Sequence, residues 1–142
     1  YILNFALDRI DDVEPMPSVK YMESDEGLEG RFYDIVGVTL PKDTDVEKIL
    51  LWVSDEQYPY IETKPIHGSQ RLLKSDNEDD ARSKYGYANG KFVELRCIPN
   101  RELLMTLASY LNGVVVLSPA SIREQMATHI MQLYNSYFEA QK

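Results

Sequence analysis

The sequence predicts an α+β domain, and three patterns indicate this fold class. Residues 44–55 carry apolar side chains at the i, i+3, i+4, i+7 spacing of one buried helix face, namely Val46, Ile49, Leu50 and Val53. Asn89-Gly90 tolerates the positive φ angles that a two-residue hairpin turn needs. Residues 114–117 are consecutively apolar, which is typical of a strand buried on both faces.

From residue 34 onward, strands are expected to alternate with helices. The expected elements are a strand at 35–40, a helix at 44–55 with Thr44 and Glu47 as a capping box, a strand at 70–74, hairpin arms at 83–88 and 91–98, a helix at 101–111, a strand at 114–117 and a last helix after Ser118. A βαββαβ unit closes into a ferredoxin-like sandwich, an antiparallel four-stranded sheet with two helices on one face. The last helix is an addition, and one of its faces carries Ile122, Met126, Ile130, Leu133 and Tyr137.

The first 33 residues have a different character. Residues 1–14 are predicted to form a strand that Asp11-Asp12 ends, and residues 15–33 have the proline, glycine and acidic composition of a linker. Residues 56–68 are expected to be irregular, and residues 76–80 to be an acidic exposed bend. Tyr1 lies in an apolar stretch, so it is not expected to be the natural N-terminus.

Composition excludes several classes of function. The net charge of −8 argues against this segment gripping a nucleic-acid backbone, which needs clustered Lys and Arg. We expect no membrane partner, because no apolar run is long enough to span a bilayer. Cys97 is the single cysteine and there are two histidines, so neither an internal disulfide nor a zinc site is expected. A cytoplasmic protein without cofactor or metal is the simplest interpretation.

The sequence contains no strong catalytic signature, but His67, Ser69 and Gln70 bring three hydrogen-bonding side chains together after a proline. They could bind a ligand or a nucleotide edge. Alternatively, they tie the irregular 56–68 segment to the domain through side chain–backbone hydrogen bonds. A small hydrolase using His67 and Ser69 is a further alternative, although no third group is implied. Trp52 and the tyrosines around residue 87 are expected to pack rather than to stack on bases.

Three short stretches resemble the C-terminal part of bacterial WYL-domain transcriptional regulators. In order, they are Leu7-Asp8-Arg9-Ile10, Pro65-Ile66-His67-Gly68-Ser69-Gln70 and Leu117-Ser118-Pro119-Ala120-Ser121-Ile122-Arg123-Glu124. The resemblance implies that residues 1–14 are the last strand of the WYL barrel and that residues 34–142 are the C-terminal extension domain. The Trp-Tyr-Leu tripeptide that names the family does not occur here.

The resemblance also implies a function. The chain would be the effector-sensing and oligomerisation portion of a regulator that forms a homodimer and binds DNA through a winged helix outside this sequence. The effector, a nucleotide or single-stranded nucleic acid, would contact Arg9, His67, Ser69 and Gln70. The guanidinium of Arg9 suits phosphate, and an ion pair with Asp8, Asp11 or Asp12 is its structural alternative. A stand-alone small-molecule-binding module of the ACT-like type is the alternative function.

Overall fold

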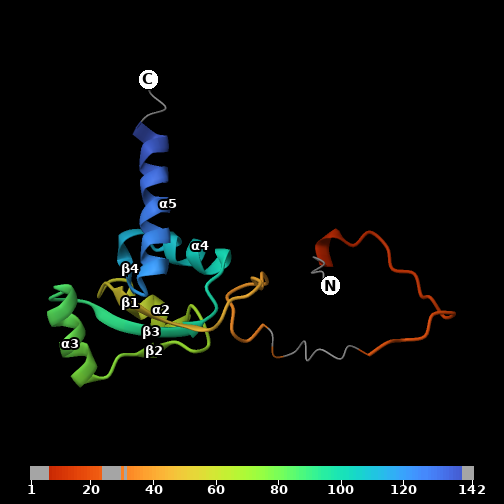
Figure 1. The fold of residues 1–142 in the computed structure, drawn as a ribbon, viewed down its shortest axis with the longest axis horizontal. Coiled ribbons are helices and arrows are strands. Elements are labelled where there is room, and N and C mark those ends of the chain that lie inside the picture. The colour runs from red at the N-terminus through yellow and green to blue at the C-terminus, as the bar shows by residue number, and fades with distance from the viewer. Residues whose placement is uncertain (1–6, 24–29, 31, 139–142) are drawn as a thin grey trace.

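The computed structural model describes residues 7–23, 30 and 32–138. Its centre is a four-stranded sheet in the order β2-β3-β1-β4, in which neighbouring strands are antiparallel. The strands are β1 (Glu47–Val53), β2 (Arg71–Leu72), β3 (Lys91–Cys97) and β4 (Val114–Ser118). The helices are α2 (Tyr58–Thr63), α3 (Ser75–Tyr85), α4 (Arg101–Ser109) and α5 (Ala120–Phe138), with 3-10 turns at Leu7–Arg9 and Leu111–Gly113. The predicted α+β class is confirmed (Figure 1).

The helix predicted at residues 44–55 is wrong, because residues 47–53 form β1. Ile49, Leu51 and Val53 are fully buried on one face of the sheet, and Leu50 and Trp52 are partly buried on the other. A strand that packs on both faces is apolar at nearly every position, so its sequence satisfies the helical spacing as well.

The Asn89-Gly90 turn leads into β3 as expected, but the first arm of the predicted hairpin is wrong. Residues 83–85 end α3, and the acidic residues 76–80, expected as a bend, form its first turns. Carboxylates in the first turn and basic side chains in the last complement the helix dipole, which favours a helix here. Gly90 has a φ of 85°, and a Cβ on it would clash with the indole ring of Trp52.

Three more segments differ from the prediction. Residues 35–40 form a loop instead of a strand, residues 56–68 contain α2, and β2 is shorter than the expected 70–74. The strand predicted at 1–14 is absent from its described part: Leu7–Arg9 is a 3-10 turn and residues 10–14 have no regular structure. Residues 1–6 lie outside the described residues. An isolated strand leaves its backbone groups without partners, so residues 7–14 would need a neighbouring strand to extend.

Helices lie on both faces of the sheet. The larger core joins one face to α2, α4 and the base of α5 through Ile61, Leu103, Leu107, Ile122 and Met126. On the opposite face, Phe92 and Leu117 pack with Ala81 of α3. The helix α3 therefore adds a layer to the predicted sandwich, and the ferredoxin-like topology stays a prediction, as do the domain boundaries at residues 14 and 34.

Residues 100–138 follow the sequence prediction closely, and the side chain of Asn100 makes three hydrogen bonds at the start of this segment. Its side chain accepts a hydrogen bond from Leu103 N at 2.8 Å and so caps α4. Its amide nitrogen also donates to Val36 O and Thr39 O, at 2.7 and 2.9 Å. Asn100 is buried, so these bonds fix the 35–40 loop to the start of α4 in a place that water does not reach.

We expect Asn100→Ala to lower the free energy of unfolding by about 1–3 kcal/mol, because it removes the cap and leaves two buried carbonyls unpaired. Urea denaturation monitored by circular dichroism measures the change. Asn100→Asp is the matched control, since it keeps the cap acceptor and loses the amide donor. Wild-type stability in both variants would contradict the role of Asn100.

Candidate functional site

His67, Ser69 and Gln70 lie in the segment between α2 and β2, and all three side chains are partly buried. The Gln70 amide nitrogen donates to Ile61 O at 2.9 Å, and its Oε1 accepts from Ile66 N at 3.0 Å. Gln70 N also donates to His67 O at 3.0 Å. Gln70 thus closes residues 61–70 into a compact loop, with Ile61 and Ile66 buried in the core beneath it.

His67 and Ser69 connect this loop to two other parts of the domain. The His67 ring contacts Tyr33 O through Nε2 at 2.8 Å and Ser69 Oγ through Nδ1 at 2.8 Å. Ser69 N donates to Nδ1 at 3.2 Å, and Ser69 Oγ accepts from Arg96 N of β3 at 2.8 Å. Because Tyr33 O is an acceptor and Ser69 N is a donor, the contacts fit a ring that donates through Nε2 and accepts through Nδ1.

These contacts bear on the alternatives that the sequence left open. His67 and Ser69 are within hydrogen-bond distance, as a serine nucleophile and its base would be. However, the other nitrogen of the His67 ring contacts the backbone carbonyl of Tyr33. The Ser69 hydroxyl also accepts a hydrogen bond from the Arg96 amide. The arrangement therefore supports loop attachment better than acyl transfer, and a ligand-binding role for the three residues stays a prediction.

Arg9 is not brought together with the other three candidates. It is exposed on the Leu7–Arg9 turn, which lies apart from the sheet in Figure 1. Among the described residues, Arg9 forms no ion pair with Asp8, Asp11 or Asp12, the partners that its structural alternative required. Its expected role as a phosphate ligand also stays a prediction.

The region around Trp52 packs as the sequence suggested. The Trp52 ring stacks on Tyr87 with centroids 4.4 Å apart, and its Nε1 donates to Asn89 O at 2.7 Å. Arg82 of α3 donates to the carbonyls of Tyr87, Ala88 and Gly90, so its guanidinium holds the loop that follows the helix. The rings of Trp52 and Tyr87 are therefore part of the packing of the domain.

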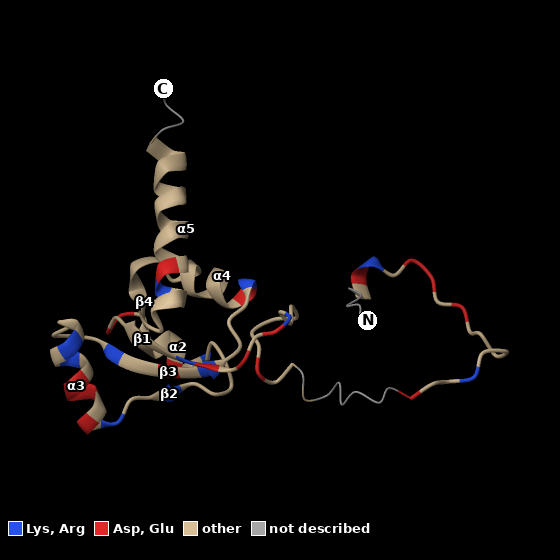
Figure 2. Cartoon of the chain, viewed as in Figure 1, with Lys and Arg blue, Asp and Glu red and all other residues tan. Residues whose placement is uncertain are grey.

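Sequence reasoning missed a row of charges on β1 and β3. Glu94 lies between Lys48 at 2.7 Å and Arg96 at 3.1 Å. In Figure 2, blue and red segments lie next to each other on β3. Burial alone would raise the pKa of Glu94, but the two cations outweigh it and hold the pKa below its ordinary value. Lys48 and Glu94 are neighbours only across strands, so the row could not be recognised while residues 44–55 were interpreted as a helix.

Two other features limit the chemistry of the domain. Within the described ranges, no group of three His, Cys, Asp or Glu side chains is arranged to hold a metal ion. Cys97 lies in the core, where burial raises the pKa of its thiol to about 11, so it is poorly suited to act as a nucleophile.

None of the helices in the described part of the chain is long and apolar enough to cross a bilayer.

We expect Gln70→Ala to lower the free energy of unfolding by about 1–3 kcal/mol, because Ile61 O and Ile66 N lose their partner. Thermal and urea unfolding measure the loss. Gln57→Ala is a matched control at a partly buried glutamine whose side chain has no hydrogen bond in the described residues. Unchanged stability in Gln70→Ala would favour a recognition role over loop attachment.

The comparisons with known proteins agree with the resemblance seen in the sequence. A family model described as the WCX domain matches residues 45–134, which include all four strands and most of α5. A comparison with curated proteins found no match. Because the matched residues make up more than half of the chain, the protein belongs to the WCX domain family, the C-terminal extension of WYL-type transcriptional regulators.

Proposed function

We propose that this chain is the oligomerisation and effector-sensing portion of a bacterial transcriptional regulator, and that it works as a homodimer in the cytoplasm. DNA would be bound by another domain of the same regulator. The family match supports a regulator's C-terminal portion, and the chain's charge of −8 makes a direct grip on duplex DNA unfavourable. The exposed half of α5 carries the oligomerisation part of the proposal.

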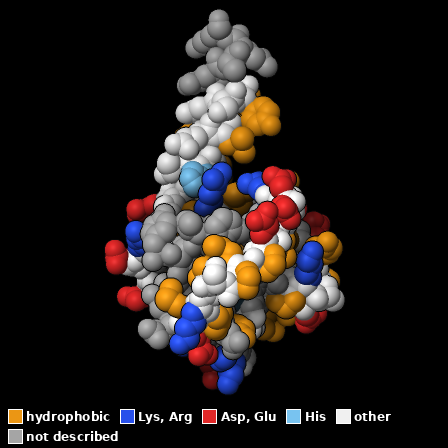
Figure 3. Space-filling view, turned by 90° about the vertical axis from the view of Figure 1, so that its right-hand side faces the viewer, with side chains coloured by type: hydrophobic (Ala, Val, Ile, Leu, Met, Phe, Trp, Pro, Cys, Tyr) orange, Lys and Arg blue, Asp and Glu red, His pale blue; other side chains and the backbone are white. Residues whose placement is uncertain are grey.

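The apolar face of α5 continues beyond the core that buries its base. Ile122 and Met126 are buried against the sheet. Ile130, Leu133 and Tyr137 follow on the same face, yet they are 60, 56 and 70% exposed. From Met126 onward, the intervals are four, three and four residues, the alternation of a and d positions in a coiled coil. We call Ile130, Leu133 and Tyr137 the α5 stripe; Figure 3 shows hydrophobic side chains on the projecting part of the helix.

A projecting helix of this kind needs a partner. Helices shorter than about 12–15 residues are marginal in water, and tertiary packing supplies most helical stability in proteins. Beyond Met126, α5 stands clear of the sheet and of α4 (Figure 1). Large apolar side chains also flank the stripe, with Tyr134 stacked on Phe138 at 4.5 Å between ring centroids. Burial of these side chains against another surface would stabilise the helix.

The charge pattern favours a second copy of this chain as that partner. Residues 125–138 contain no Asp, Glu, Lys or Arg, although the chain as a whole carries −8. Two identical acidic chains repel each other wherever their charged surfaces meet, and the uncharged half of α5 is a place where they can meet without that cost. A two-fold pair of α5 helices would bury the same stripe on both copies, as symmetric dimers do.

We expect Leu133→Asp to convert a dimer into a monomer, because it places a charge at the centre of the α5 stripe. Sedimentation equilibrium should give about twice the 16.4 kDa chain mass for the wild type and one chain mass for the variant. Gln132→Asp is the matched control: it adds the same charge on the same turn, off the stripe, and should remain dimeric. The proposal fails if the wild type is monomeric, or if Leu133→Asp dimerises as tightly as Gln132→Asp.

A further inference from the structure

The helix α3 is held over the sheet by its end and by the loop after it. Among its residues, only Ala81 is buried, so few apolar contacts connect the helix to the strands. Arg82 anchors the end of the helix instead, through the carbonyls of Tyr87, Ala88 and Gly90 in the loop that leads into β3. A helix fixed in this way can stand off the sheet and leave space beneath it.

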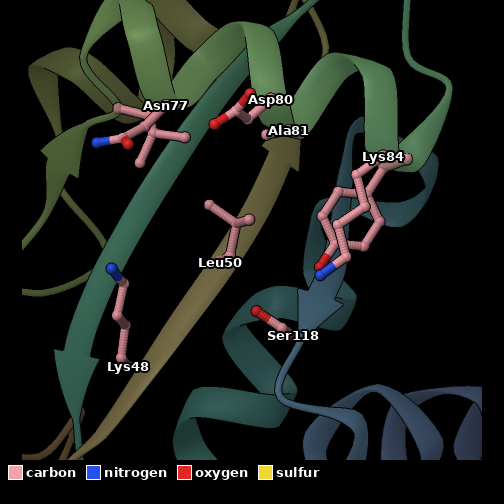
Figure 4. Close-up of a pocket in the computed structure, with 9 residues that line it drawn as sticks. Lys48, Leu50, Asn77, Asp80, Ala81, Lys84 and Ser118 are labelled. Atoms are coloured by element: carbon pink, nitrogen blue, oxygen red, sulfur yellow. The ribbon is translucent and has the colours of Figure 1, made fainter.

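That space is a groove of about 340 Å³ between α3 and the strands β1 and β4. Its apolar surface comes from Leu50, Leu73 and Ala81, and its polar rim from Lys48, Asn77, Asp80, Lys84, Tyr85 and Ser118. Figure 4 shows Leu50 in the middle, Lys48 rising from β1 on one side, and Lys84 reaching from α3 toward the end of β4 at Ser118. The size falls in the range of about 300–1,000 Å³ that small-molecule sites occupy.

The groove differs in charge from the rest of the chain. Its lining has two cations, Lys48 and Lys84, against the single anion Asp80, which gives a net charge of +1 in a chain of −8. Lys48 pairs with Glu94, but Arg96 contacts the same carboxylate, so adding these two neighbours leaves the net charge at +1. Near Lys84, the hydroxyls of Tyr85 and Ser118 add hydrogen-bond donors for an anionic group.

We propose that this groove binds a small organic anion with a flat apolar body. The body would lie between the partly buried Leu50 and Leu73 on the sheet side and Ala81 of α3, and its phosphate or carboxylate would contact Lys84 and Ser118. The shared chemistry, a flat ring with one anionic group, fits a nucleoside monophosphate or an aromatic acid. The inference rests on the proposed function and deepens it, because it locates the effector site on the extension domain itself, in a groove that His67, Ser69 and Gln70 do not line.

The test is a titration of the whole 142-residue chain, followed by ¹⁵N–¹H NMR, with AMP and separately with indole-3-acetate. Saturable shifts are expected at Lys48, Leu50, Lys84 and Ser118. The neutral analogues adenosine and indole-3-acetamide should bind about tenfold more weakly, since they lack the charge-assisted hydrogen bonds. Tighter binding of AMP identifies a phosphate ligand, and tighter binding of indole-3-acetate identifies a carboxylate.

Two variants locate the site. Lys84→Glu reverses a charge on an exposed side chain and should weaken both anions about tenfold. Lys64→Glu makes the same change on an exposed lysine outside the groove and should leave the affinity nearly unchanged. Equal weakening in the two variants, or no saturable shift of the groove amides with either anion, would overturn the site.

The same titration on Leu133→Asp separates this inference from the dimer proposal. The groove is lined by one chain, so the monomeric variant should bind with wild-type affinity. If the wild type is itself monomeric and still binds the anions, the oligomerisation proposal fails while the groove stands. Loss of binding in Leu133→Asp would contradict a site built within a single chain.

Discussion

The burial of β1 on both faces is the constraint on which the rest of the structure depends. Ile49, Leu51 and Val53 are fully buried on one side, and β1 hydrogen-bonds to β3 and β4 along its two edges. A strand in this position needs cover on both faces, because its consecutive apolar side chains point alternately to one face and the other. The chain provides that cover in two ways. The side of Ile49 is closed by α2, α4 and the base of α5, whereas the side of Leu50 is only partly closed by α3.

The two kinds of cover explain where apolar surface remains. On the well-packed side, the core ends at Met126 while α5 continues to Phe138, so the face that begins in the core extends outward as the α5 stripe. On the other side, α3 contributes one small buried residue, Ala81, and leaves Leu50 and Leu73 partly buried beside the groove. The His67, Ser69 and Gln70 hydrogen bonds belong to neither surface. They fasten the loop between α2 and β2 to Tyr33, Ile61 and β3.

The sequence predicted residues 100–138 well, since they carry local signals that agree with their tertiary setting. Asn100 caps α4, and the apolar run at residues 114–117 lies in β4. The prediction failed where a local pattern was ambiguous: β1 fits helical spacing because both its faces are buried, and α3 lacks an apolar face from which a helix could be recognised. For the candidate site, loop attachment through backbone hydrogen bonds was one of the alternatives that the sequence offered. The backbone partners of His67 and Ser69 could not be identified, because Tyr33 and Arg96 lie far away in sequence. The groove requires strands β1 and β4 to be placed beside α3, which no short-range pattern encodes.

Hydrogen exchange of α5 as a function of protein concentration tests most directly the claim that this helix is completed by a second copy of the chain. The amides of residues 122–126 lie in the folded core, so their protection should be independent of concentration. The amides of residues 130–137 should exchange quickly in dilute protein and become protected as concentration rises, because pairing stabilises the projecting turns. Protection of residues 130–137 that does not change with concentration, whether high or low, would contradict the account.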